Sequence, residues 1–160
     1  MAKVLVLYYS RGGNTRKMAE LVAEGAVSAG GKVDLKPVNK VSAENLLDYD
    51  AIIAGSPTYY GHMCAELKKL FDDSVQFHGR LNGKVGGAFS SAANIGGGNE
   101  TTIMGILQVM LIHGMIIQGT PHGDHYGPVA IGAPDERAAK GCRELGERLA
   151  RLAAQLHDRE

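Results

Sequence analysis

Residues 3–15 read KVLVLYYSRGGNT, and this stretch carries the strongest fold signal in the chain. Its first seven residues are nearly all apolar, which is typical of a strand buried on both faces of a parallel sheet. Residues 14–29 follow with apolar side chains at helical spacing, and Gly30 and Gly31 end that pattern. A buried strand that leads through a glycine-rich turn into a helix predicts the first strand–helix unit of an α/β fold.

The same alternation of short apolar runs and longer helical patterns continues along the chain. We expect strands at residues 3–9, 32–38, 50–55, 84–91, 115–119 and 129–131. We expect helices at residues 14–29, 63–77 and 100–113, a short one near 42–47, and a final one with Pro134 in its first turn. Such repeats predict a single doubly wound α/β domain over residues 1–160, with a parallel sheet between two helix layers.

Two segments of this pattern have specific roles in the expected sheet. Pro37 places the 32–38 strand at an edge, because proline lacks the N–H that a central strand needs. The final helix carries an apolar stripe that a short coiled coil would also explain. Docking on the sheet is favoured, because the stripe is short and the sheet needs a cover. The stripe consists of Cys142, Leu145, Leu149, Leu152 and Leu156.

Composition excludes several classes of protein. Seventeen Lys and Arg balance seventeen Asp and Glu, so no net field attracts nucleic acid or an anionic membrane. Cys64 and Cys142 are far apart and form no CxxC motif, which argues against a disulfide framework. The most apolar stretch, residues 101–117, is interrupted by Gln108 and His113 and is too short to span a bilayer comfortably. We therefore expect a cytoplasmic protein without membrane insertion.

The turn after the first strand, residues 10–15 (SRGGNT), is typical of an anion site. Its glycines let backbone N–H groups converge at a helix N-terminus, where the helix dipole favours negative charge. It lacks the lysine of a nucleotide-triphosphate loop, so a monophosphate is the expected ligand. The alternative is a tight turn capped by Ser10 or Asn14. Arg11 either pairs with the phosphate or faces solvent.

Two further loops are expected at the same edge of the sheet, because the carboxyl ends of parallel strands bind ligands. Residues 56–62 (SPTYYGH) place two adjacent aromatic rings where a planar group can stack. Residues 91–99 (SAANIGGGN) offer backbone donors and no charge. A phosphate cradle, stacking rings and a donor-rich loop together predict a site for flavin mononucleotide (FMN).

The SxGGNT turn resembles the phosphate loop of flavodoxins. The segments SPTYYGHM (56–63), FSSAANIGGGNETT (89–102) and HGM (113–115) resemble the Trp-repressor-binding-protein family, the flavodoxin-like NAD(P)H:quinone oxidoreductases. The resemblance covers almost the whole chain and implies a five-stranded flavodoxin-like sheet of order 2-1-3-4-5. It assigns the bound FMN to the three loops and to one histidine, whose alternative role is a helix cap. These residues are Ser10, Arg11, Gly12, Gly13, Asn14, Thr15, Pro57, Thr58, Tyr59, Tyr60, Gly61, Ser91, Ala92, Ala93, Asn94, Ile95, Gly96 and His113.

The sequence departs from that family where the substrates bind. Gly12 stands where the family has an aromatic residue for the nicotinamide, the chain has no Trp, and two insertions are shortened. We expect His125 and Tyr126 to lie near the substrate, in a loop above the flavin. A metal site at His122 and His125 is disfavoured, because the spacing fits no standard zinc pattern and a fourth ligand is missing. The flavin carries the chemistry, so no catalytic side chain is expected.

The resemblance implies an enzyme that passes electrons from NADH or NADPH to a quinone. A one-electron carrier that serves redox proteins is the alternative, although such flavodoxins are typically strongly acidic. Here charge is balanced, and the third loop has no carboxylate before Glu100, which favours two-electron chemistry. A flavin-binding module without turnover is a third class. The apolar residues 103–112 fit either a buried helix or a homodimer or homotetramer contact.

Overall fold

The structure is a computed structural model that describes residues 1–157. Strands and helices alternate along the chain, as the apolar pattern predicts. The strands are β1 (Lys3–Tyr8), β2 (Lys32–Pro37), β3 (Ala51–Pro57), β4 (Val85–Ala92), β5 (Ile116–Ile117) and β6 (Val129–Ile131). The helices are α1 (Asn14–Ser28), α2 (Ala65–Asp73), α3 (Asn99–Ile112) and α4 (Glu136–His157), with short 3-10 turns η1 (Val38–Lys40), η2 (Glu44–Asp48) and η3 (Ser74–Phe77).

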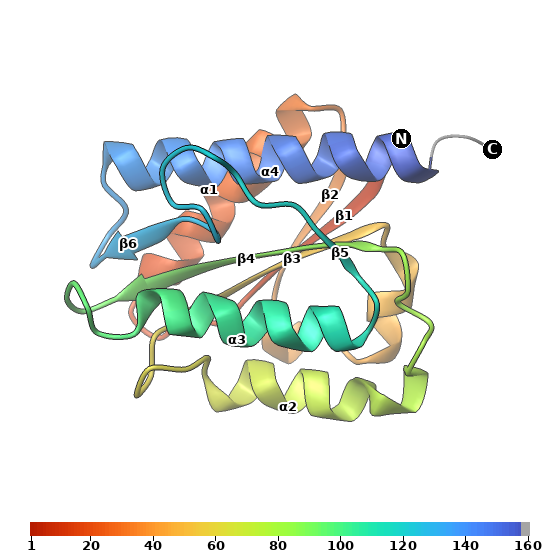
Figure 1. Ribbon diagram of the computed structural model, residues 1–160, viewed down its shortest axis with the longest axis horizontal. Helices are drawn as coiled ribbons and strands as arrows, with labels where there is room; N and C mark the ends of the chain where they lie inside the picture. The colour runs from red at the N-terminus through yellow and green to blue at the C-terminus, as the bar shows by residue number, and fades with distance from the viewer. Residues whose placement is uncertain (158–160) are drawn as a thin grey trace.

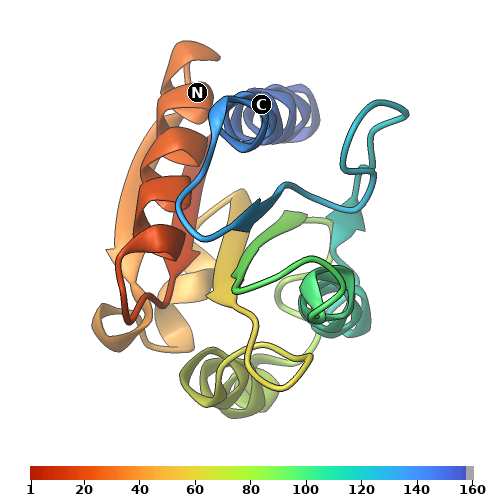
Figure 2. The same ribbon diagram turned by 90° about the vertical axis from the view of Figure 1, so that its left-hand side faces the viewer.

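The parallel sheet has the order β2-β1-β3-β4-β5, which confirms the predicted strand order. Successive residues of a strand point to opposite faces, so Leu5 of β1 enters one apolar cluster and Val6 the other. Figures 1 and 2 show α1 and α4 over one face of the sheet and α2 and α3 over the other. Both faces are thus buried, and the doubly wound α/β prediction is confirmed.

The β4 edge of the sheet holds both short strands predicted there, at residues 115–119 and 129–131, but the first is only Ile116–Ile117. β5 pairs with the first two residues of β4, whereas β6 pairs with its last three. Residues 118–128 separate the two short strands, and this segment is rich in His, Pro and Gly. Gly127 comes back so close to β4 that an added Cβ would lie 2.0 Å from a β4 carbonyl oxygen. Two short strands therefore share one edge position.

Two helices have other ends than the sequence pattern predicts. The helix predicted at 63–77 is α2 up to Asp73 and then tightens into the 3-10 turn η3. The carboxylate of Asp135 accepts the N–H of Ala138 at 2.8 Å, so Asp135 is the N-cap of α4. Pro134 therefore lies before the helix and not in its first turn.

The connections after β1, β3 and β4 emerge at one end of the sheet, because these strands run parallel. Figure 2 looks onto this end and shows the three connections around it. Each helix that follows begins there and runs back along the sheet. The topology therefore gathers segments that are about 40 residues apart in the sequence at a single edge.

Candidate functional site

The first loop joins β1 to α1 and leaves the start of the helix open. Gly13 has φ 97 and donates its N–H to the hydroxyl oxygen of Ser10 at 3.0 Å, which closes the turn. No side chain caps α1, and no acidic residue lies in its first turn. Within residues 1–157 the N–H groups of Asn14, Thr15 and Arg16 have no acceptor. These free donors and the helix dipole form a cradle for an anion.

The second loop turns sharply after β3 and presents its two tyrosines differently. Tyr59 and His62 exchange backbone hydrogen bonds of 2.9 and 3.1 Å, so the turn between them is tight. Tyr60 has φ 49 and Gly61 has φ 80, as a two-residue hairpin turn requires. The ring of Tyr60 is fully exposed at the turn tip, whereas Tyr59 packs edge-on against Tyr9 with 6.3 Å between centroids.

The phenol of Tyr59 is a hydrogen-bond donor at neutral pH. Its burial raises the pKa of the Tyr59 hydroxyl, and the nearby Tyr9 adds to the shift. The positive charge of Arg11 opposes this shift but does not reverse it. Arg11 itself is exposed and forms no ion pair within the described part of the chain. The two side chains bring a neutral donor and a cation to adjacent loops.

The third loop is clamped onto the second. An added Cβ on Gly98, which has φ 110, would lie 2.5 Å from the Cα of Gly61, so the two backbones touch. The Thr101 hydroxyl donates to the carbonyl oxygen of Gly61 at 2.7 Å. The N–H of Thr58 donates to the carbonyl oxygen of Ser91 at 2.7 Å. These contacts set the width of the space that the two loops enclose.

A group of buried hydroxyls lies beneath the loops and joins them. Thr15 and Ser91 share a hydrogen bond of 2.8 Å between α1 and β4. Thr58 bonds Ser90 at 3.0 Å and accepts from Thr102 at 3.2 Å. Sequence reasoning assigned no role to Ser90, Thr102, Gly98 or Thr101. The run of serine, glycine and threonine in residues 89–102 indicates a polar cluster. Which of these hydroxyls bond one another depends on the register between β3 and β4.

The predicted third loop begins two residues later than expected. Ser91 and Ala92 are the last residues of β4 and are buried, and the Ser91 hydroxyl is engaged by Thr15. From Ala93 to Gly96 the chain is exposed, and Ile95 projects with 87% of its surface accessible. The exposed backbone donors predicted for this loop therefore belong to residues 93–96.

Within one chain, the structure places His113 away from the three loops. His113 follows the end of α3, which starts at the loop edge and spans about 20 Å at 1.5 Å per residue. Its Nε2 bonds the hydroxyl of Ser74 at 2.7 Å near the opposite edge of the sheet. The reason is topological, because a crossover helix runs antiparallel to the strands it connects.

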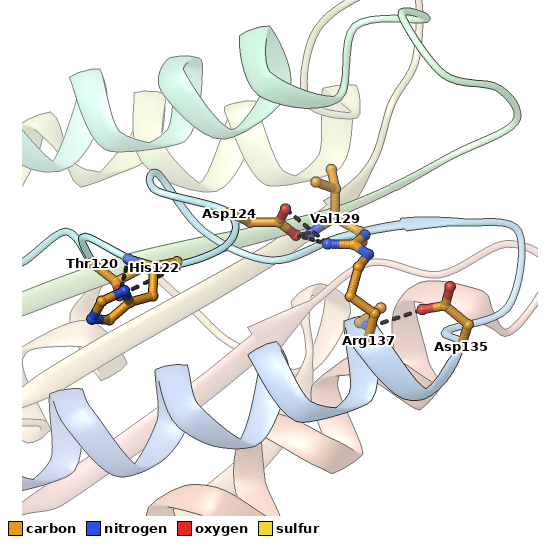
Figure 3. Close-up of polar contacts among 7 residues, drawn as sticks. Thr120, His122, Asp124, Val129, Asp135 and Arg137 are labelled. Carbon is orange, nitrogen blue, oxygen red and sulfur yellow. Dashed lines mark hydrogen bonds and ion pairs between the residues drawn. The ribbon is translucent and has the colours of Figure 1, made fainter.

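His125 and Tyr126, which are expected near the substrate, lie in the segment that joins β5 to β6. Their loop stands beside α4 at the β4 edge, apart from the first and second loops (Figure 2). Asp124 holds it there, because its carboxylate accepts from Arg137 at 2.8 Å and from the N–H of Val129 at 2.9 Å (Figure 3). Sequence reasoning missed this pairing, since Asp124 and Arg137 belong to a loop and a helix with no shared pattern.

The histidines of this loop contact backbone atoms. The ring of His125 bonds the carbonyl oxygen of Thr120 at 2.9 Å, and the backbone N–H of His122 donates to the Thr120 hydroxyl at 3.3 Å. Among residues 1–157 no group of three His, Cys, Asp or Glu side chains is placed to hold a metal ion.

Comparison with known proteins agrees with this geometry. A sequence model described as a flavodoxin domain matches residues 5–92, more than half of the chain. The chain belongs to the flavodoxin family. Among its flavodoxin-family relatives, a protein named flavodoxin from Aquifex aeolicus (strain VF5) is 44% identical over 163 residues, which cover 96% of this chain and 88% of the relative.

Other members of the flavodoxin family are named as enzymes. A protein named NAD(P)H dehydrogenase (quinone) from Sinorhizobium fredii is 39% identical and covers 99% of this chain and 100% of the relative. The alignment with this relative extends over 199 positions, although this chain has 160 residues, so the relative carries insertions. The crystal structure of the flavodoxin, WrbA-like protein from Agrobacterium tumefaciens has a TM-score of 0.82 and 28% identity, covering 98% of this chain and 99% of that chain.

The residues of this flavodoxin-family site fit FMN. Gly12 and Gly13 have nothing within 4 Å of an added Cβ, so the first loop has room for a phosphate at the uncapped start of α1. The exposed rings of Tyr60 and Tyr59 offer surfaces for a planar group. The third loop adds uncharged backbone donors for its polar edge. Each part of the cofactor thus has a chemically matched loop.

Proposed function

We propose that this protein is an FMN-dependent oxidoreductase that passes electrons from NADH or NADPH to a quinone. The observation that carries this proposal is the junction of the three loops, which supplies donors and has no carboxylate within residues 10–15, 56–62 or 91–99. Relatives named NAD(P)H dehydrogenase (quinone), 35–39% identical over 98–99% of this chain, support the same assignment. Quinone reduction requires two electrons, which a donor-lined and uncharged site favours.

We assign the cofactor contacts to three loops and the ends of β3 and β4. The phosphate is held by the first loop, and the ring lies between the second and third. The proposed residues are Ser10, Arg11, Gly12, Gly13, Asn14, Thr15, Pro57, Thr58, Tyr59, Tyr60, Gly61, Ser91, Ala92, Ala93, Asn94, Ile95 and Gly96. The contacts between Thr15, Thr58 and Ser91 support this grouping, since they hold the three segments together.

FMN supplies the redox chemistry when bound: NAD(P)H, a quinone and one proton give NAD(P)⁺ and the quinol. The hydride carries both electrons and one proton, and solvent supplies the second proton. This chain positions the reactants and tunes the site. The neutral Tyr59 hydroxyl is a donor beside the second loop, and the unpaired Arg11 attracts a phosphate.

We further propose that residues 1–160 form one domain that works in the cytoplasm. Cys64 and Cys142 are both free and buried, as expected in a reducing compartment. Within the described residues, no helix is long and apolar enough to cross a membrane. The quinone therefore approaches from the medium that surrounds the loops.

A second candidate function is one-electron transfer to a redox protein. It is favoured by one specific observation, the 44% identity to a protein named flavodoxin over 96% of this chain. Gly12 supports it as well, because the resemblance places an aromatic residue for the nicotinamide at this position. A carrier would bind FMN equally well but would need a partner enzyme to reduce it.

Anaerobic titration of the FMN-loaded protein with NADH, and separately with NADPH, distinguishes the two functions. For the oxidoreductase, the oxidised flavin absorbance bleaches directly to the two-electron-reduced spectrum, and adding a benzoquinone restores it. An unchanged spectrum under both donors would exclude the enzyme and leave the carrier. The variant Tyr59→Ala/Tyr60→Ala is expected to weaken FMN binding and shift its spectrum, whereas Tyr126→Ala, in the 118–128 loop, leaves both unchanged.

We also propose that copies of this chain associate as a dimer or tetramer. Leu111 and Ile112 at the end of α3 are 56% and 72% exposed, and Ile116 of β5 is exposed beside them. Val75 of the neighbouring turn is 70% exposed. Four large apolar side chains near one end of α3 support contact with another copy.

A further inference from the structure

A cavity of about 980 Å³ is lined on one side by the first loop, including Ser10, Arg11, Gly12 and Gly13 of the proposed phosphate site. Its walls are the end of β1 and the first loop, the connection from Pro37 to Glu44, and the side of α2 from Glu66 to Phe77. No residue of the second or third loop lines it. A volume of this size holds a molecule of drug-like dimensions. The cavity is therefore separate from the proposed contacts of the flavin ring.

The cavity has an apolar floor and a charged rim. Its apolar lining residues are all buried or half-buried, and most of them belong to or pack against the core cluster between the sheet and α2. These floor residues are Tyr8, Tyr9, Pro37, Val38, Val41, Ala43, Leu70 and Phe77. Every charged lining residue is exposed at the rim: Arg11, Arg16, Glu44, Glu66, Lys69 and Asp73.

The rim charges balance, which favours a neutral ligand. Three of them are positive and three negative. Lys69 bonds Asp73 at 2.7 Å, and Arg16 bonds Glu20 at 3.0 Å, so most rim cations are already paired. A polyanionic nucleotide would therefore meet little unpaired positive charge apart from Arg11. An uncharged molecule with an apolar part matches both the rim and the floor.

Tyr9 connects the cavity to the redox site. Its ring lines the cavity floor and packs edge-on against Tyr59 of the second loop at 6.3 Å. A ligand seated in the cavity thus has a path along one aromatic pair to the loop that carries Tyr60. The cavity thus has an apolar floor, and Tyr9 links that floor to the loop proposed to flank the flavin.

We propose that this cavity holds the hydrophobic tail of the quinone, so that the preferred substrate is a quinone with an isoprenoid chain. This inference rests on the proposed function and adds the class of quinone. The quinone ring lies at the Tyr59 side, and the tail lies across the floor formed by Val38, Val41 and Phe77. The connection from Pro37 to Glu44 is the part that decides tail binding, because it forms the wall opposite α2.

The test is a series of benzoquinones with one ring structure and none, one or two isoprene units, reduced by NADH with the FMN-loaded protein. Each of the two units is expected to lower KM about tenfold, because each removes apolar surface from water. kcat is expected to change little. In Val41→Thr, a variant of the same size with a hydroxyl on the floor, the ratio of tailless to tailed KM shrinks by about threefold to tenfold.

Val27→Thr is the matched control, because Val27 is 58% exposed on α1 and does not line the cavity, and it is expected to keep the full ratio. A KM that does not depend on the tail would overturn the inference, and so would a ratio of tailless to tailed KM that Val41→Thr leaves intact. In either case, NADH-driven reduction of the tailless quinone would still support the proposed function. Calorimetric binding of the oxidised quinones without NADH provides a readout independent of turnover. Tail-dependent binding that Val41→Thr weakens supports the cavity even if no quinone is reduced.

Discussion

Gly98 is the residue on which the geometry of the loop junction depends most directly. Its φ of 110° lies in the left-handed region, which favours glycine, and an added Cβ would lie 2.5 Å from the Cα of Gly61. The contact fixes the distance between the second and third loops. Any larger residue must therefore push the two loops apart.

Gly98→Ala is expected to destabilise the protein by about 3 kcal/mol and to lower its affinity for FMN at least tenfold. The control is Gly105→Ala, within α3. Its added Cβ would meet only the end of the Met63 side chain, at 3.7 Å. This control is expected to be neutral or to stabilise the helix by up to about 1 kcal/mol. Urea unfolding and FMN titration measure both effects. Equal behaviour of the two variants would show that the Gly98–Gly61 contact is unimportant.

His113 is a buried histidine whose proton position follows from its neighbours. The Ser74 hydroxyl donates to the carbonyl oxygen of Phe71 at 2.6 Å, so Nε2 of His113 must donate to Ser74. Nδ1 is then unprotonated, and within the described chain it has no hydrogen-bond partner. Burial lowers the pKa of His113, and the nearby His78 lowers it further.

Because of this histidine, we expect the free energy of unfolding to decrease as the pH falls. Since its pKa is lower in the folded than in the unfolded state, its contribution to stability is complete above about pH 6.5 and is lost as pH falls below that value. We expect the free energy of unfolding to fall between pH 7 and pH 5, and His113→Gln to flatten this slope. His62→Gln, at an exposed position, is the control. A slope that persists unchanged in His113→Gln would contradict the assignment.

Among the elements, α4 shows how a sequence stripe becomes a packing surface. Cys142, Leu145 and Leu149 are buried against the sheet and α1, which confirms docking and not a coiled coil. Leu152 is half-buried and Leu156 is exposed, since the helix extends beyond the sheet. The last residue of the stripe therefore does not pack on the sheet.

The crossing of α1 and α4 depends on two glycines that the stripe does not include. An added Cβ on Gly146 would lie 2.0 Å from the carbonyl oxygen of Val22, and one on Gly25 would lie 2.0 Å from that of Arg143. The two backbones are thus in direct contact. We expect Gly146→Ala to separate the helices and cost about 3 kcal/mol, or a Tm about 10 °C lower.

Lys140→Ala on the exposed side of α4 is the control for this variant, and it is expected to stay within about 0.5 kcal/mol of the parent. Calorimetric unfolding of the three proteins provides the comparison. A Tm of Gly146→Ala within 2 °C of the parent, a threshold of about 0.5 kcal/mol, would show that the helices separate without cost.

For the whole molecule, the balanced charge and the exposed apolar residues near the end of α3 both bear on assembly. With no net charge, copies do not repel one another at long range. Light scattering at micromolar concentration is expected to give the mass of a dimer or tetramer. Ile112→Lys is expected to shift the protein to a monomer, whereas Val27→Lys, 58% exposed on α1, is not. A monomeric parent protein would contradict the proposed association.

Assembly also bears on the position of His113. Within one chain it lies about 20 Å along α3 from the loops, and its neighbours Leu111 and Ile112 are exposed. Within one chain, His113 therefore lies away from the flavin contacts proposed for the three loops. Its environment within one chain is the Ser74 hydroxyl and a buried apolar cluster.

The alternation of strands and helices, the doubly wound class and the identity of the three loops were predictable from the chain alone, whereas the strand order came from the resemblance to flavodoxins. The predictable features depend on signals that are local in sequence: apolar runs, helical spacing and glycine clusters such as Gly12 and Gly13. Parallel topology then places every strand's carboxyl end at one edge, so the loops converge without further information. For this reason the three loops predicted to bind the flavin lie close together in the fold.

The remaining features depend on pairs of residues that no local pattern relates. Asp124 and Arg137 hold the 118–128 loop, which carries His125 and Tyr126, at α4. The cavity beside the first loop exists because the short connection after β2 and the side of α2 enclose it, and neither segment has a ligand motif. Such positions follow from side-chain packing between distant segments, which is decided only when the whole chain has folded.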